Sequence, residues 1–309
     1  MTAPEKKIEY RGNADKLHQK IVKNAIAYGE LVKLGHTLFA LPFALSAVCL
    51  AYLEGYSLSV LKLVWIVLAF TAARSAAMGF NRVVDAKIDA ANPRTLRRPT
   101  VTGEIGMRYA KLFSFLSAAL FLLFAWLINP LCFALAFPAL AVLLGYSYAK
   151  RFTWGAHYVL GIALALAPTG AWIAVTGNFS PAILALSGVL MFHIAGFDLI
   201  YSLQDMEFDI ANRLHSIPAR FGVRATLLIS GASFAAAVSL LVITGWLFAL
   251  SAAYFSCVAI IAAMYAVGQI VINRCGMKRV NEVFFYLNVL ISALIFVGIA
   301  SNLVYRLKF

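Results

Sequence analysis

The sequence has little charge, and negative charge is the scarcest. Charged residues make up 13% of the 309 residues and hydrophobic residues 62%, whereas a soluble domain typically has about 25% charged residues. A water-soluble fold of this composition would leave much apolar surface in contact with water. Strict alternation of polar and apolar residues is also absent, so membrane-spanning strands are not predicted. The sequence predicts an all-α, polytopic membrane protein, because helices satisfy their own backbone polar groups inside the bilayer.

Cysteine is also rare, and the N-terminal region has no apolar core. The four cysteines are widely spaced, which predicts neither a disulfide framework nor a zinc site. Residues 1–33 are polar and basic, so we expect a cytoplasmic arm and no cleavable signal peptide. The net charge of +13 comes from basic residues in short loops between apolar runs. Such residues determine topology and contact anionic lipid head groups, so the predicted partner is the lipid bilayer and not nucleic acid.

Nine apolar segments are each long enough to cross the bilayer as a helix. We expect them at about 34–53, 58–80, 109–128, 131–149, 156–176, 181–201, 225–245, 249–272 and 283–304. Lys and Arg follow every even-numbered span, which places these loops in the cytoplasm. We expect one transmembrane domain, 34–309, with two parallel halves at about 34–150 and 156–272 and a last helix. The predicted location is the inner membrane of a bacterial or archaeal cell, with the functional end facing the cytoplasm.

The few acidic residues gather in two short stretches at the predicted cytoplasmic ends of spans two and six. Six of the 13 acids lie there: Asp85 and Asp89 in the first stretch, and Asp198, Asp205, Glu207 and Asp209 in the second. At 100° per residue, the two aspartates of the first stretch share one helix face with Asn81, and three of the second share one with Tyr201. Carboxylates crowded at a helix C-terminus repel each other and oppose the helix dipole. Their placement therefore indicates a bound cation.

A hard divalent cation would offset this negative charge. Mg²⁺ in proteins commonly combines a few carboxylates with substrate phosphate oxygens, and the nearby Arg94, Arg98 and Lys150 suit phosphate. The two stretches therefore predict a diphosphate site. Two alternatives stay open: the acids pair with neighbouring basic residues at the membrane surface, or they line the path of an ion-coupled transporter. Their position at one rim, and not at the midplane, favours the diphosphate site.

At these residues the sequence resembles the UbiA superfamily of intramembrane prenyltransferases. Its motifs Asn-x3-Asp-x3-Asp and Asp-x2-Tyr-x3-Asp-x3-Asp match Asn81/Asp85/Asp89 and Asp198/Tyr201/Asp205/Asp209. The segments 92–99, 146–151 and 216–222 match as well, and the resemblance covers nearly the whole chain. Residues 36–43 and 204–209 look like the 4-hydroxybenzoate polyprenyltransferase group. More narrowly, they look like the branch associated with menaquinone made by the futalosine route.

The resemblance implies Mg²⁺-dependent transfer of a polyprenyl group from polyprenyl diphosphate to an aromatic acid of the 4-hydroxybenzoate type, in ubiquinone or menaquinone biosynthesis. One Mg²⁺ would be held by Asn81, Asp85 and Asp89, and another by Asp205 and Asp209. The implied diphosphate ligands are Asn81, Arg94, Arg98, Lys150 and Arg151. The implied catalytic residues are Asp198, Tyr201 and Lys150. The isoprenoid tail would lie in an apolar tunnel between helices.

Three residues are candidates for contacts with the acceptor. Arg74 shares the helix face of Asn81, where it either meets the acceptor carboxylate or extends to the membrane rim. His36 and Tyr146 lie near the cytoplasmic ends of their predicted spans. Either they contribute to the acceptor pocket, or His36 is an ordinary helix-end histidine and Tyr146 an ordinary interfacial tyrosine. The acceptor itself stays open: a dihydroxynaphthoate, haem, chlorophyllide or a glycerol lipid is the alternative to hydroxybenzoate.

Overall fold

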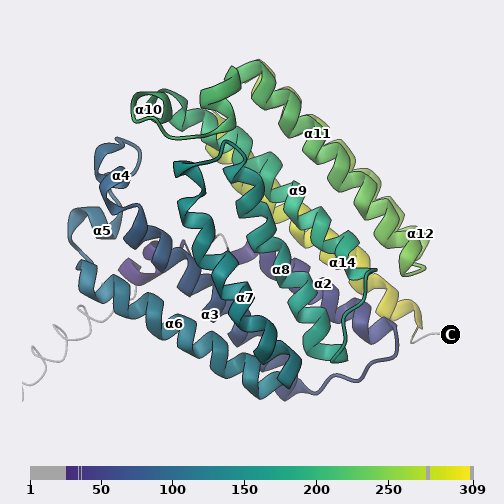
Figure 1. Ribbon diagram of the computed structural model, residues 1–309. Helices are drawn as coiled ribbons and strands as arrows, with labels where there is room; N and C mark the ends of the chain where they lie inside the picture. The colour runs from purple at the N-terminus through teal and green to yellow at the C-terminus, as the bar shows by residue number, and fades with distance from the viewer. Residues whose placement is uncertain (1–25, 34, 36, 276–278, 307–309) are drawn as a thin grey trace, which may run out of the picture.

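A computed structural model describes residues 26–33, 35, 37–275 and 279–306, and His36 lies outside this part of the chain. Long helices run side by side in an elongated bundle (Figure 1). All regular secondary structure in the described residues is helical. The predicted all-α class is therefore confirmed.

In the described part of the chain, eight long helices and one run of three consecutive helical elements correspond to the nine predicted spans. The residues of the first predicted half form α2 (Thr37–Leu53), α3 (Val60–Val84), α6 (Met107–Ile128) and α7 (Pro130–Gly145). Those of the second form α8 (Ala156–Thr176), α9 (Ile183–Ser202), α11 (Ile217–Leu247) and α12 (Ala252–Cys275). The last span is α13 (Val280–Glu282), the π-helical turn η5 (Val283–Leu287) and α14 (Asn288–Arg306).

Eight of these spans in the described chain are long and apolar enough to cross a membrane. The exception is α2, whose 17 residues extend over only about 25 Å at 1.5 Å per residue. The grouping of the spans into two parallel halves stays a prediction. Nevertheless α3 packs mainly on α6, and α9 packs mainly on α11 and α8. The α3–α6 and α9–α11 contacts are the pair that a repeat of the first half in the second would bring together, whereas α8–α9 has no equally close counterpart in α2–α3.

The core lies around α9. Most residues of this helix are buried, and its aromatic and branched side chains contact α2, α8, α11 and η5. Phe197, for example, is fully enclosed and packs against Phe234 with ring centroids 4.8 Å apart. By contrast, α6 and α7 are mostly exposed on the outside of the bundle. This outer surface is apolar, as expected for helices that face lipid.

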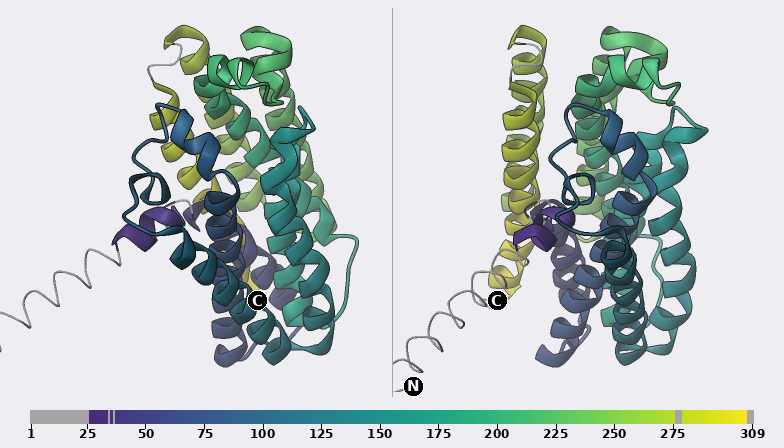
Figure 2. Two further views of the ribbon diagram at one scale, coloured as in Figure 1. Left: turned by 60° about the vertical axis from the view of Figure 1, so that its left-hand side comes forward. Right: turned by 90° about the vertical axis from the view of Figure 1, so that its left-hand side faces the viewer.

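Short helical elements gather at one end of the bundle, where the two acidic stretches lie (Figures 1 and 2). They are α4 (Ala86–Ala91), α5 (Pro99–Thr102), η2 (Tyr146–Arg151), η3 (Leu203–Asp205) and α10 (Met206–Ala211). Ion pairs between Arg94 and Asp205 and between Lys150 and Asp209 connect these elements across the end of the bundle. The predicted placement of both acidic stretches at the same end is confirmed.

Each acidic stretch was expected to continue one helix, and this expectation is wrong in the same way twice. The long helix stops at Asp85 (φ −92°, ψ 5°) in the first stretch and before Asp205 (φ −100°, ψ 1°) in the second, and a new short helix follows each. The hydrogen bonds from Asp85 N–H to Asn81 and from Asp89 N–H to Asp85 persist across the first break. Successive acids therefore remain about one turn apart even though the helix is interrupted.

The seventh span begins earlier than expected. It is expected at about 225–245, but α11 starts at Ile217. Ser216 caps this start, since its hydroxyl accepts a hydrogen bond from the N–H of Ala219 at 3.3 Å. The helix then bends at Gly222, whose φ of 76° suits glycine. The first turn thus folds over the end of the bundle that carries the acids.

Candidate active site

A cavity of about 720 Å³ leads from the acidic end into the bundle. Its polar end is lined by both acidic stretches and by the loop that contains Arg94 and Arg98. Its deeper part is lined by small and apolar side chains of α2, α3, α6, α7 and α8, such as Ala73, Ala167 and Gly170. The helices α11 and α12 contribute no lining residue among those described. The cavity therefore joins a highly charged end to an apolar interior.

The first acidic stretch has two carboxylates in different surroundings. Asp85 accepts hydrogen bonds from the side-chain amide of Asn81 at 2.8 Å and from Arg151 at 2.9 Å. Asp89 is nearly buried, forms an ion pair with Arg98 and lies 4.0 Å from an Arg82 nitrogen. Burial raises the pKa of Asp85, and the Arg151 and Asn81 contacts counteract this only in part. A further cation beside Asp85 would therefore stabilise its charged form.

The second acidic stretch is held by residues from the other half of the chain. Asp205 accepts hydrogen bonds from Arg94 Nε at 2.7 Å and from the Asn92 amide at 3.0 Å. Asp209 is 2% exposed and lies 3.6 Å from Lys150 Nζ. The N–H of His215 also donates to the Lys150 carbonyl at 2.8 Å, which fixes the backbone next to this ion pair. At the mouth of the cavity, Asp205 is thus paired with Arg94, and Asp209 with Lys150.

Two carboxylate oxygens at this end are suited to a metal ion. Oδ2 of Asp89 and Oδ2 of Asp209 are buried, and within the described chain neither has a hydrogen-bond partner. Each faces a cation, Arg82 at 4.0 Å and Lys150 at 3.6 Å, but a buried carboxylate oxygen without a hydrogen bond is costly, and a hard cation such as Mg²⁺ would satisfy it. No group of three or more His, Cys, Asp or Glu residues in the described part is arranged to hold a metal alone. The residues therefore fit Mg²⁺ ions whose coordination is completed by other oxygens, such as those of a diphosphate.

Tyr201 and Asp198 occupy the wall between the charged and apolar parts of the cavity. The hydroxyl of Tyr201 accepts a hydrogen bond from Arg94 at 2.9 Å, and the Arg94 guanidinium lies 4.9 Å from the ring centroid. The side chain of Asp198 is 25% exposed and lies 2.7 Å from Nδ1 of His157. Tyr201 is thus hydrogen-bonded to Arg94, whereas Asp198 is hydrogen-bonded to His157.

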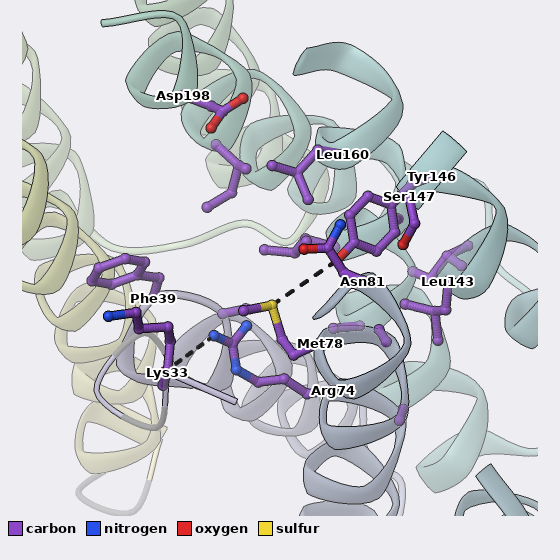
Figure 3. Close-up of a pocket in the computed structure, with 18 of the residues that line it drawn as sticks. Lys33, Phe39, Arg74, Met78, Asn81, Leu143, Tyr146, Ser147, Leu160 and Asp198 are labelled. Atoms are coloured by element: carbon purple, nitrogen blue, oxygen red, sulfur yellow. Dashed lines mark hydrogen bonds between the residues drawn. The ribbon is translucent and has the colours of Figure 1, made fainter. Parts of the chain in front are cut away.

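Two of the predicted acceptor residues, Arg74 and Tyr146, line the cavity (Figure 3), and the third, His36, lies outside the described residues. Arg74 donates to the hydroxyl of Thr37 at 3.0 Å and to the carbonyl of Lys33 at 3.5 Å. None of the acids in the described residues forms an ion pair with it, so its charge is available to an anionic ligand. Tyr146 lies on the opposite wall, with its hydroxyl 3.9 Å from the sulfur of Met78. A cation and a phenol thus face the same space.

Most of the predicted site residues come together at the cavity. All of them except Arg151 and the undescribed His36 line it. Arg151 instead binds Asp85 and the carbonyls of Ser147 and Val84. The Arg151 guanidinium also lies 5.2 Å from the ring centroid of Tyr148, which is likewise outside the lining. We therefore treat Arg151 as support for Asp85 and not as a diphosphate ligand.

Three residues of the site were not predicted. Asn92 is the first residue of the matching segment 92–99 and binds Asp205, so its position in that segment was an available signal. Lys33 lines the cavity, and burial lowers its pKa, with Arg82 and Arg98 lowering it further. His157 is buried and contacts Asp198. No pattern in the sequence identifies His157, because its contact depends on how α8 and α9 align.

Comparison with known proteins agrees with this geometry. The UbiA prenyltransferase family matches residues 40–290. The 4-hydroxybenzoate octaprenyltransferase of Alkalilimnicola ehrlichii is 32% identical over 246 residues, covering 78% of this chain and 82% of that protein. The enzyme of the same name from Actinobacillus pleuropneumoniae serotype 5b is 28% identical over 238 residues, covering 75% and 81%.

Solved structures share the fold over nearly their whole length. The apo structure of a UbiA homolog from Aeropyrum pernix K1 has a TM-score of 0.78 at 32% identity, covering 87% of this chain and 98% of that one. A UbiA homolog from Archaeoglobus fulgidus has a TM-score of 0.65 at 24% identity, covering 89% and 99%. The ion-coupled transporter considered for the acidic clusters is therefore the wrong class. The chain belongs to the UbiA prenyltransferase family and is a multi-pass integral membrane enzyme that transfers a prenyl group.

Proposed function

We propose that this enzyme transfers a polyprenyl group from polyprenyl diphosphate to an aromatic acid of the 4-hydroxybenzoate type, in an Mg²⁺-dependent reaction of quinone biosynthesis. The observation that carries the proposal is one cavity with three suitable parts. Its mouth has four carboxylates and their basic partners, its interior is apolar, and Arg74 lies between them. The names of the relatives from Alkalilimnicola and Actinobacillus support this acceptor class.

The donor diphosphate would lie among the charged residues at the mouth. The Archaeoglobus fulgidus homolog has been solved with geranyl diphosphate and Mg²⁺, and with dimethylallyl diphosphate and Mg²⁺. In this chain, Asn81, Asp85 and Asp89 would hold one Mg²⁺, and Asp205 and Asp209 another. Bound Mg²⁺ would neutralise the negative charge that develops on the leaving diphosphate. Arg94, Arg98 and Lys150 would bind its outer oxygens once the acids release them.

The chain's own residues would then direct the group transfer. Arg94, held over Tyr201, presents its remaining N–H groups to the mouth, where charge develops as the carbon–oxygen bond of the donor breaks. The ring of Tyr201 lines the cavity and already carries the Arg94 guanidinium 4.9 Å from its centroid, so Tyr201 would hold Arg94 in place at the mouth. The tail would fill the apolar cavity, whose walls exclude water from the allylic cation.

The acceptor would bind between Arg74 and Asp198. Arg74 has only uncharged partners among the described residues, so a carboxylate would complete its interactions. This contact favours acceptors that carry a carboxylate, which include both hydroxybenzoate and dihydroxynaphthoate. Asp198 would contact the ring hydroxyl from the other wall, and its acidic side chain suits a hydroxyl donor.

The membrane orientation is also part of the proposal. The basic residues concentrated in the loops of the acidic end support a cytoplasmic location for that end in a bacterial or archaeal inner membrane. The two matching helix breaks, at Asp85 and Asp205, support the division into two parallel halves. A Glu104→Cys variant tests the orientation, because Glu104 is exposed at the acidic end. The introduced thiol is labelled in intact cells. Labelling from the outside of the cell would contradict the proposed orientation.

A direct assay tests the function. Purified enzyme in detergent is supplied with geranyl diphosphate, Mg²⁺ and either 4-hydroxybenzoate, dihydroxynaphthoate or phenol. We expect product with a carboxylated acceptor and very little with phenol. In Arg74→Gln, the preference for 4-hydroxybenzoate over phenol falls by about 10-fold or more, as expected when one charged hydrogen-bond partner is lost. Arg108→Gln, at an exposed position of the same end, is the matched control. No product with any acid, or an unchanged preference in Arg74→Gln, would contradict the proposal.

A further inference from the structure

His157 lies outside the cavity lining but contacts a residue within it. Its side chain is fully buried in the first turn of α8, between Gly155 and Gly161. Nδ1 lies 2.7 Å from Oδ2 of Asp198 on α9. Because an ionised carboxylate only accepts hydrogen bonds, Nδ1–H is the donor. The other ring nitrogen, Nε2, is buried and has no hydrogen-bond partner among the described residues.

A buried imidazole with one unpartnered nitrogen is an unfavourable choice for simple packing. An apolar side chain of similar shape would fill the same space without the desolvation cost of Nε2. The polar ring is explained by its contact with Asp198. Among the described residues, His157 is the only hydrogen-bond partner of that carboxylate. The neighbouring cation Arg94 is already bound to Asp205 and Tyr201.

The backbone next to this pair is rigid. At Gly161, one turn after His157, an added Cβ would lie 2.5 Å from the carbonyl oxygen of Met191 on α9. The two helix backbones are therefore in direct contact, and α8 and α9 cannot slide without losing it. The N-terminus of α8 also points its positive dipole end toward this region, which stabilises a nearby carboxylate. His157 and Asp198 thus form a fixed pair across two packed helices.

The orientation of Asp198 follows from this pair. With Oδ2 bound to His157, Oδ1 is the oxygen left for the cavity, which Asp198 lines. Asp198 and Arg74 lie on opposite sides of the cavity (Figure 3). An aromatic acid bound through its carboxylate at Arg74 would extend its ring toward Asp198. The position of Oδ1 then decides whether the ring hydroxyl is held beside the donor.

We propose that His157 is a positioning residue that fixes the Asp198 carboxylate so that its free oxygen accepts a hydrogen bond from the hydroxyl of the acceptor. This inference rests on the proposed aromatic acceptor. Donor binding at the acidic mouth does not involve the pair. Loss of His157 therefore impairs the use of the acceptor and leaves Mg²⁺-dependent binding of the donor intact.

A double-mutant cycle with Asp198 tests the proposal. We expect His157→Phe to lower kcat/KM for the acceptor about 10- to 100-fold, the range for a misplaced contact, with unchanged affinity for geranyl diphosphate. His157→Gln retains an N–H donor and restores most of the activity. In an Asp198→Asn background, His157→Phe has little further effect, because its only route of action is already lost.

The outcomes separate the possible failures. A purely structural role would lower kcat/KM by the same factor in the wild-type and Asp198→Asn backgrounds, and that result would overturn the proposal. Equal loss of donor and acceptor binding in both His157 variants would overturn it too. Full acceptor turnover by His157→Phe would overturn this inference alone and leave the proposed function standing. If the wild-type enzyme prenylates no aromatic acid, the proposed function fails and this inference fails with it.

Discussion

The two predicted halves of the chain carry matching acidic stretches but unequal shares of the basic residues that serve them. Asp89 pairs with Arg98, Asp205 with Arg94 and Asp209 with Lys150, and each of these cations belongs to the first half. Arg151, which pairs with Asp85, follows directly after it. The basic residues after the second acidic stretch, namely Arg213, Arg220 and Arg224, form none of the ion pairs of these four acids. The second stretch thus depends on cations supplied by the first half.

The same inequality extends into the membrane. The first half supplies α3, α6 and α7 to the cavity wall, whereas the second supplies mainly α8 and the edge of α9. Of the remaining long helices of the second half, α11 packs on the buried α9, whereas α12 packs on α11 and α14. The first half therefore supplies most of the cavity wall, and the second supplies much of the core. If the halves are a repeat, their roles are unequal.

The largest expected effect comes from removing the carboxylates, which both halves contribute. Asp85→Asn/Asp89→Asn and Asp205→Asn/Asp209→Asn should each lower kcat by about 10³-fold or more, because each removes one of the two proposed Mg²⁺ sites at the leaving group. Glu207→Gln, an exposed acid of α10, is the control and should change kcat less than about two-fold. Mg²⁺-dependent product formation is the measurement. Activity retained in either double variant would show that one half suffices.

The next prediction contrasts basic residues of the two halves. Arg94→Gln should lower kcat/KM for the donor by about 10²-fold, since it removes a charge-assisted ligand and releases Asp205. Arg220→Gln should leave kcat/KM nearly unchanged, because Arg220 is exposed and lies over Phe221. Both variants are assayed with geranyl diphosphate over a range of Mg²⁺ concentrations. A similar loss in both variants would contradict the unequal roles of the two loops.

A third prediction concerns the walls of the apolar cavity. Gly170 of α8 lines the cavity, and a Cβ added there has no atom within 4 Å. Gly170→Leu should therefore place its side chain inside the cavity and block long tails. We expect kcat/KM for a long polyprenyl diphosphate to fall about 10-fold or more relative to geranyl diphosphate.

The matched control for this change is Gly145→Leu. Gly145 ends α7, is exposed, and also has open space around an added Cβ, but it does not line the cavity. The donor preference of this variant should equal that of the wild type. Equal loss of long and short donors in Gly170→Leu would show that the tail does not extend to this level of α8.

The sequence was sufficient to predict what depends on composition and local spacing. Nine apolar runs identified the spans, and spacing of about one turn brought Asn81, Asp85 and Asp89 to the cavity together. Local patterns failed where a backbone departs from regular helix. The breaks at Asp85 and Asp205 occur beside carboxylates whose partners come from distant segments. The sequence alone does not specify these partners.

Contacts between distant segments account for the rest of what was missed. Arg151 was expected at the diphosphate, but the short helix η2 turns it toward Asp85 and the carbonyl of Val84. His157 gave no signal because its meaning depends on the register of α8 against α9. The motif residues could be predicted from their local spacing, whereas the contact of His157 with Asp198 depends on two packed helices and could not.

The smallest expected effect tests Tyr201, a second-half residue whose uncharged hydroxyl binds Arg94 of the first half. Tyr201→Phe removes the hydroxyl that binds Arg94 but keeps the ring beneath the guanidinium. A single neutral partner of a charged donor is lost, so kcat/KM for the donor should fall by about 3- to 10-fold. Tyr148→Phe is the control, because Tyr148 lies outside the cavity lining. If Tyr201→Phe reduced kcat/KM as much as Arg94→Gln, the hydroxyl itself would be the essential group. The second half would then contribute to the mouth as much as the first.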